Sequence, residues 1–300
     1  MCRDYEKATT DRIILAGLVI TVALSLVTFA QAYPETYRVD SGCCSSHVLA
    51  KDFSAYYVGA WRLFHDAANV YTPGVVADGG PNISPHPETF KYLPSFLLYV
   101  SPLLLLSYPT ALVSFDVFQL LLLPLMAFFI FRLVRERGVV VTLIVGAIVL
   151  LQPSPSWQWG LSASYYWQWG EGQAKVLQTF LLLLSFYLGS RKKPFLSGAA
   201  LGLAAFDLRF ALISLPLFLV YNKPQFRLAA AGALCFGLAS NLPFIIPGVA
   251  SGFESMMLSS GVTTPLYYYS YIPLLTIVCL TILKASDVAG LVRKARAWPD

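Results

Sequence analysis

Apolar runs of helical length recur along the chain, and they limit its fold more than any other feature. The first, residues 13–32, is uncharged and long enough as a helix to cross about 30 Å of hydrocarbon. Only 12% of the 300 residues are charged, against roughly 25% in soluble domains. Because lipid offers the backbone no hydrogen-bond partner, helices are the expected spanning elements. We therefore expect an all-α polytopic membrane protein, a single transmembrane domain over residues 1–300, with roughly seven to nine helices.

Residues 30–32, Ala-Gln-Ala, match the small-residue pattern that precedes signal-peptide cleavage. The apolar run before them is longer than that of a cleaved signal, and many apolar runs follow. Cleavage stays open as an alternative, but we expect the first helix to remain in the protein.

Basic residues divide the loops into two groups. They fill the turns at residues 132–137, 191–193 and 222–227 and the tail at residues 284–300. In membrane proteins the short loops on the cytoplasmic side carry the excess of Lys and Arg. We therefore expect a multi-pass protein of the cell membrane, with these turns and the basic tail in the cytoplasm. The long polar segment 33–89 is then an extracytoplasmic loop.

Two segments do not fit a simple series of full spans. Residues 195–220 have basic groups at both ends, which suits a short broken helix pair that turns back near Asp207 and Arg209. Two full spans between residues 89 and 132 would put the arginine turn outside. We expect residues 92–107, which prolines punctuate, to re-enter from the outer side instead. The alternative is that the arginine turn is an exception to the charge rule.

The long polar loop holds the first candidate for chemistry, Asp52. Aromatic residues follow it with helical spacing, at positions 53, 56, 57, 61 and 64, and predict an interfacial helix over residues 52–69 with one aromatic face. An aspartate in the first turn of a helix is stabilised by the helix dipole alone. Burial among apolar neighbours raises the pKa of a carboxyl group, so Asp52 is alternatively a general base.

Charged residues within the apolar runs are the second group of candidates, because such residues are costly in lipid. Asp207 and Arg209 can neutralise each other as an ion pair. Alternatively, Arg209 binds a phosphate group with its planar guanidinium. Lys175 lies near the start of another apolar run and is a further candidate cation, unless its side chain extends to the interface.

Aromatic and cysteine residues of the outer loops have two interpretations each. The Trp-Gln-Trp-Gly repeats that begin at Trp157 and Trp167 suit an aromatic belt at the lipid boundary, or stacking against a sugar. Cys43 and Cys44 are two free thiols, a strained vicinal disulfide, or one bridge to a partner. The sequence has no CxxC pair, no Walker loop and no metal-like spacing of Cys and His. No basic run interleaved with aromatics suggests nucleic-acid binding.

Several short motifs follow one another in a specific order. They are Asp52-Phe53, Asn69-Val70-Tyr71, Phe90-Lys91-Tyr92-Leu93-Pro94, Gly172-Gln173 and a glycine-to-cation element from Gly198 to Arg209. In this order they resemble glycosyltransferase family 87 of the GT-C superfamily, over residues 12–220. Leu93, Asn69 and Arg209 depart from the family pattern, although Arg209 keeps the cation.

The resemblance implies a GT-C-like helical bundle that moves a hexose, typically mannose, from a polyprenyl-phosphate donor to an acceptor hydroxyl. The acceptor would be a glycan or glycolipid on the outer face, and transfer would proceed with inversion. Asp52 is then the catalytic base. The candidate cations for the donor phosphate are Arg209, Lys175 and Lys91. The candidate substrate-binding residues are Tyr56, Tyr57, Tyr92, Trp167 and Gln173. We expect no metal and no cofactor, because the lipid-linked sugar is itself a substrate.

Two other classes of protein are alternatives to a glycosyltransferase. A non-catalytic polytopic subunit would keep the fold and lend its lipid groove to a membrane complex, and the short chain favours it. The joint presence of Asp52 and Arg209 favours the enzyme. A transporter would show broken helices in two matching halves, whereas residues 195–220 have no matching segment in the sequence. The sequence does not identify a protein partner.

Overall fold

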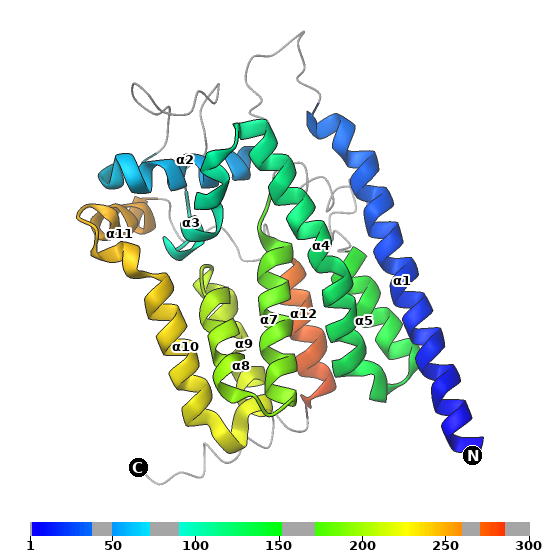
Figure 1. Cartoon of the computed structure of the whole chain (residues 1–300). Helices are drawn as coiled ribbons and strands as arrows, with labels where there is room; N and C mark the ends of the chain where they lie inside the picture. The colour runs from blue at the N-terminus through cyan, green and yellow to red at the C-terminus, as the bar shows by residue number, and fades with distance from the viewer. Residues whose placement is uncertain (1, 38–49, 73–89, 152–171, 260–270, 286–300) are drawn as a thin grey trace.

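The computed structural model describes residues 2–37, 50–72, 90–151, 172–259 and 271–285, and these residues form helices joined by turns, with no strand among them. Figure 1 shows most of the helices running side by side in one bundle, with α2 (Lys51–His65) lying across one end. The expected all-α fold is therefore confirmed.

Within the described part of the chain, two helices are long and apolar enough to cross a membrane: α1 (Cys2–Tyr37), over Tyr5–Val27, and α4 (Tyr108–Val134), over Tyr108–Arg137. One stripe of α1 packs on the bundle, with Ile14 and Leu18 buried, while apolar side chains such as Val19 and Ile20 are exposed. Exposed apolar side chains on a long helix are expected where the surface meets lipid. A hydrogen bond also joins α1 to the segment Val139–Leu151, because Ser25 Oγ donates to the carbonyl of Leu150 at 2.8 Å.

The rest of the bundle is built from shorter helices. They are α5 (Val139–Leu151), α7 (Lys175–Ser190), α8 (Pro194–Ala204), α9 (Leu208–Asn222), α10 (Phe226–Ser240) and α12 (Tyr271–Leu283). Helices α8 and α10 approach most closely, because Gly198 and Gly232 present no side chain to the other helix. A Cβ atom at Gly198 would overlap the carbonyl group of Ala229. Small residues allow this kind of close packing between membrane helices.

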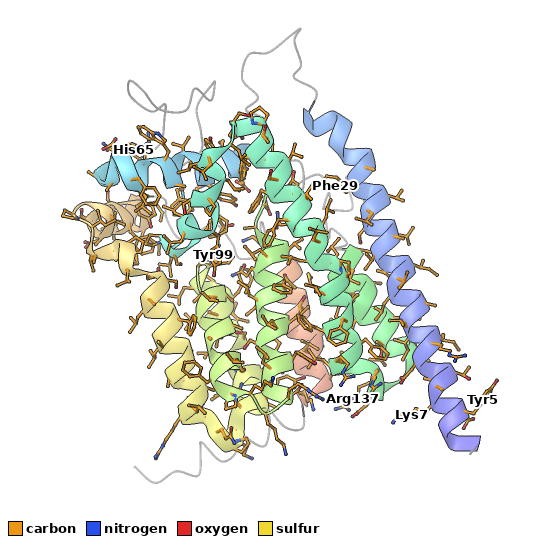
Figure 2. All side chains as sticks on the ribbon, viewed as in Figure 1. Tyr5, Lys7, Phe29, His65, Tyr99 and Arg137 are labelled. Carbon is orange, nitrogen blue, oxygen red and sulfur yellow. The ribbon has the colours of Figure 1, made fainter. Side chains whose placement is uncertain are left out.

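The basic turns lie together at the end of the bundle opposite α2. One contains η3 (Arg135–Arg137), the second joins α7 to α8, and the third contains η5 (Lys223–Gln225). Figure 2 shows Arg137 and Lys7 at this end and His65 of α2 at the other. An ion pair closes the corner between α1 and η3, with Arg135 Nη1 2.9 Å from Asp11 Oδ2. We call this end of the bundle the basic end.

The segment before α4 turns back on itself. It contains α3 (Ser95–Val100) and η2 (Ser101–Leu105), which together are far shorter than a membrane span. The hydroxyl of Tyr57 in α2 donates to the carbonyl of Leu106 at 2.7 Å, so the segment has returned to α2 before α4 begins. Helix α4 then runs from the α2 end to the basic end (Figure 1). The arginine turn therefore lies at the same end of the bundle as the other basic turns.

Helix α2 does not have the single aromatic face that its spacing predicted. Phe53, Tyr56 and Tyr57 are buried, whereas Phe64 is 60% exposed. Most side chains from Phe53 to Leu63 are buried, because α3, η2 and α4 pack against more than one side of α2. After η1 (Ala67–Asn69) the chain packs against α11 (Val249–Ser259), where the rings of Tyr71 and Phe253 lie 5.4 Å apart.

Candidate active site

The amino-terminal turn of α2 positions the first candidate residue, Asp52. Its neighbour Phe53 is fully buried, with its ring 5.2 Å from that of Phe115 and 5.6 Å from that of Tyr108, both in α4. Asp52 is half-buried and lies in the first turn, where the helix dipole favours a carboxylate. Phe53 thus fixes the start of α2 against α4, and Asp52 stands at the edge of the packed region.

Gly172 brings the start of α7 against this turn. Its φ of +66° is one that glycine adopts without strain. A Cβ atom at this position would also lie 2.6 Å from the Cβ of Phe53. The next residue, Gln173, is 7% exposed and therefore enters the packed region beside α2. Only glycine suits this approach, which accounts for the Gly-Gln pair that the sequence showed at the start of α7.

Three charged residues meet at the start of α7. Lys175 Nζ lies 3.4 Å from Asp207 Oδ2, and both side chains are 3% exposed. Arg209 forks onto the same carboxylate, with Nε 2.9 Å from Oδ1 and Nη2 2.8 Å from Oδ2. Two cations share one carboxylate, so the triad carries one excess positive charge (2 − 1 = +1). An anion placed at Lys175, Asp207 and Arg209 would be attracted by this excess.

The turn between α8 and α9 holds the triad in place. Asp207 caps α9, because its Oδ1 accepts from the backbone N–H of Arg209 at 3.3 Å. From α7, Gln178 Nε2 donates to the carbonyls of Ala204 and Asp207, each at 3.3 Å. Helix α8 has 11 residues, a length of about 16 Å. The turn therefore lies part-way along the bundle, below α2, with Asp207 buried and Leu208 and Arg209 exposed.

Two tyrosines connect Asp52 with the triad. The rings of Tyr56 and Tyr92 are 5.6 Å apart, and Lys175 Nζ lies 5.0 Å from the centre of the Tyr92 ring. Burial raises the pKa of Tyr56 well above its ordinary value, with smaller contributions from Tyr92 and Asp52. The Tyr56 hydroxyl therefore stays neutral, and it has no hydrogen-bond partner of good geometry among the described residues. The Tyr92 side chain and the backbone of Ala174 lie within reach of this hydroxyl.

The segment that carries Tyr92 is tied to the triad by the backbone. Leu93 N–H donates to the carbonyl of Phe206 at 2.9 Å, next to Asp207. The Phe206 ring, which the sequence analysis did not select, lies 4.8 Å from Phe96 and 5.9 Å from Tyr92. Residues that are 113 positions apart in the chain are thereby held in one cluster (206 − 93 = 113). The proline-punctuated entry into α3 thus positions Tyr92 over Lys175.

The predicted site residues fall into three groups. Asp52, Tyr56, Tyr92, Gln173, Lys175 and Arg209 lie along this connected region. Tyr57 turns away and bonds to Leu106, and Lys91 is exposed. Trp167 lies outside the described residues, as do Trp157, Cys43 and Cys44.

The structure bears on how the charges of Lys175, Asp207 and Arg209 are accommodated. Lys175 is buried and does not extend to an exposed interface. Asp207 and Arg209 do form the ion pair, and the Arg209 side chain is still 42% exposed. That one carboxylate serves both cations was not predictable from the spacing of these residues. Asp116 and Gln119 of α4, which were not among the predicted site residues, are both fully buried.

The fold and this region define an all-α membrane protein with a half-buried aspartate near a cationic centre. The sequence model of glycosyltransferase family 87 matches residues 90–270, which is more than half of the chain. The chain belongs to glycosyltransferase family 87, and the expected family is confirmed. The match includes Tyr92, Lys175 and Arg209 and begins after Asp52. No curated protein and no solved structure matches the chain.

Proposed function

We propose that this membrane glycosyltransferase moves a hexose, mannose in the first instance, from a polyprenyl-phosphate donor to a hydroxyl group of a glycan or glycolipid acceptor. Family membership supplies the reaction class, a sugar donor and an acceptor. The observation that carries the finer proposal is the excess positive charge of Lys175, Asp207 and Arg209, connected to Asp52 through Tyr56 and Tyr92. An anionic leaving group and a base are the two functions that such a transfer needs.

In this mechanism Asp52 accepts the proton of the acceptor hydroxyl as its oxygen attacks the anomeric carbon. The bond between that carbon and the phosphate oxygen breaks, and the sugar is inverted. The polyprenyl phosphate leaves as a monoester with one more negative charge than the diester. Arg209 and Lys175 stabilise this developing charge, as fixed cations do in other transfer reactions. The exposed part of Arg209 is the side that a phosphate can approach.

The outer face of the membrane is the proposed side of the reaction. The basic turns gather at the end of the bundle opposite α2 (Figure 1), and such turns are cytoplasmic in most membrane proteins. Asp52 and α2 would then face outward, where lipid-linked sugars and not nucleotide sugars are the donors. The protein would cross the membrane several times.

The proposal is tested by transfer from donors labelled in the sugar, with purified protein in detergent and a membrane extract as the source of acceptor. We expect Asp52→Asn to lower the rate by about 10²- to 10⁴-fold, the usual contribution of a general base. Asp66→Asn is the matched control, because Asp66 lies at the other end of α2 and contacts Asn69. A near wild-type rate in Asp52→Asn would remove Asp52 from the mechanism. A folded wild-type protein that transfers from no polyprenyl-phosphate sugar would favour the non-catalytic subunit instead.

A further inference from the structure

A second concave site lies at the basic end, far from α2. It is a cavity of about 280 Å³ between the ends of α4, α9 and α12. Figure 2 shows Arg137, one of its lining residues, at this end of the bundle. Pockets for drug-sized ligands have about 300–1,000 Å³, so this cavity is sized for a small group. None of the residues proposed for sugar transfer lines it.

The cavity is cationic on its polar side. Among the described residues that line it, the cations Arg137 and Lys284 outnumber the carboxylates, of which Glu136 supplies one. Lys284 follows α12, and its Nζ lies 5.6 Å from the centre of the Tyr221 ring in α9. The two cations therefore come from different parts of the chain and meet only in the folded protein.

The other side of the cavity is apolar and packed. Leu280 is 2% exposed, and Leu283 is partly buried beside it. The ring of Tyr221 stacks on that of Phe186 in α7, with 5.7 Å between centroids and 24° between planes. Buried side chains of α7, α9 and α12 therefore hold this wall in place, and the shape of the cavity follows from the packing of these helices.

Further basic residues surround the cavity. Three exposed cations lie in or beside the neighbouring turns at the same end: Arg191, Lys193 and Arg227. The electrostatic potential at this end therefore attracts anions. Basic pockets between membrane helices on the cytoplasmic side are suited to the head groups of anionic lipids. An inorganic phosphate ion has the same charge chemistry, but it would make no use of the leucine wall.

We propose that this cavity binds the phosphate-bearing head group of an anionic phospholipid, with Arg137 and Lys284 as the cations and Leu280 and Leu283 against the adjoining glycerol and acyl carbons. The site is separate from the proposed transfer site, and this inference does not depend on the proposed function.

The test is a thermal-shift titration of the purified full chain in a neutral detergent. The probes are dioctanoyl phosphatidylglycerol, dioctanoyl phosphatidylcholine and inorganic phosphate. We expect phosphatidylglycerol to stabilise the wild type and phosphatidylcholine to do so far less. Each surface cation contributes about 1 kcal/mol toward an anionic lipid, which is about fivefold in affinity. Arg137→Gln/Lys284→Gln should therefore bind phosphatidylglycerol roughly 25-fold more weakly. The matched control is Arg191→Gln/Lys193→Gln, which removes the same charge at the same end outside the cavity and should keep the shift.

The outcomes separate the alternatives. An equal shift with inorganic phosphate would overturn the lipid and leave a free-phosphate site. No shift in the wild type, or the same loss in the control variant, would overturn the cavity as a site. If the double variant does not fold, Glu136→Gln decides, because removing the carboxylate must strengthen binding by about fivefold if the cavity is occupied. Unchanged binding in Glu136→Gln would count against the proposal.

Discussion

Lys175 Nζ lies 3.4 Å from Asp207 Oδ2, and each of these side chains is only 3% exposed. The pair joins the start of α7 to the start of α9 inside the bundle. A buried ion pair is weak evidence of stability by itself, because both charges lose their hydration. Its position near Tyr92 and Arg209 gives it a second purpose, the placement of positive charge where a phosphate is proposed to leave.

The first prediction concerns the cost of breaking this pair. Asp207→Asn leaves Lys175 buried without a compensating carboxylate and should destabilise the protein by about 3–5 kcal/mol. Adding Lys175→Met should recover part of that loss, since it removes the buried charge. Thermal unfolding of the two single variants and the double variant in detergent gives the coupling, expected at about 0.5–3 kcal/mol. Additive effects would mean that the pair does not interact in the protein.

The second prediction separates binding from structure at Arg209. Arg209→Gln should raise the KM for the polyprenyl-phosphate donor by about tenfold or more, because a hydrogen bond to a charged group contributes about 1.5–3 kcal/mol. Arg209→Lys should restore part of the affinity, since it keeps the charge without the fork. Arg191→Gln is the control for loss of one exposed cation. An unchanged KM and kcat in Arg209→Gln would assign Arg209 to the structural ion pair alone.

Much of the architecture was predictable because it depends on local patterns. Apolar runs predicted the helices, and basic groups at both ends of residues 195–220 predicted the turn that separates α8 from α9. Prolines predicted that the segment before α4 is no full span, and it consists of two short helices. These patterns are read over a few turns of chain, so tertiary packing had little opportunity to override them.

The geometry of the site was less predictable, because it depends on contacts between distant segments. Adjacent positions on a helix differ by about 100° in direction. Tyr56 therefore meets Tyr92, while Tyr57 bonds to Leu106. Spacing alone cannot tell which of two adjacent tyrosines faces a site. Lys175 was expected near the right place, but its burial against Asp207 requires the α8–α9 turn to lie part-way along the bundle.

The third prediction tests the contact between α2 and α7. Gly172→Ala would put a Cβ atom 2.6 Å from that of Phe53 and hold an alanine at a φ of +66°. We expect it to lower the transfer rate and the thermal stability. Gly138→Ala is the matched control, because Gly138 has a φ of +100° but nothing within 4 Å of its Cβ position. Gly138→Ala carries at least as much backbone strain as Gly172→Ala, so a larger loss in Gly172→Ala reports the overlap with Phe53. Equal losses would mean that backbone strain, and not the packing against Phe53, makes Gly172 necessary.

The fourth prediction concerns the side of the membrane on which the site lies. Single cysteines at Thr72, after α2, and at Ser190, the last residue of α7, lie at opposite ends of the bundle in exposed positions. In a background without the five native cysteines, Thr72→Cys should react with a membrane-impermeant maleimide added to intact cells. Ser190→Cys should react only after the membrane is opened, because the charge rule puts the basic turns in the cytoplasm. Both variants must keep transfer activity for the labelling to count. The reverse pattern would place Asp52 in the cytoplasm and rule out transfer on the outer face, while leaving the ion triad and its proposed phosphate contact untouched.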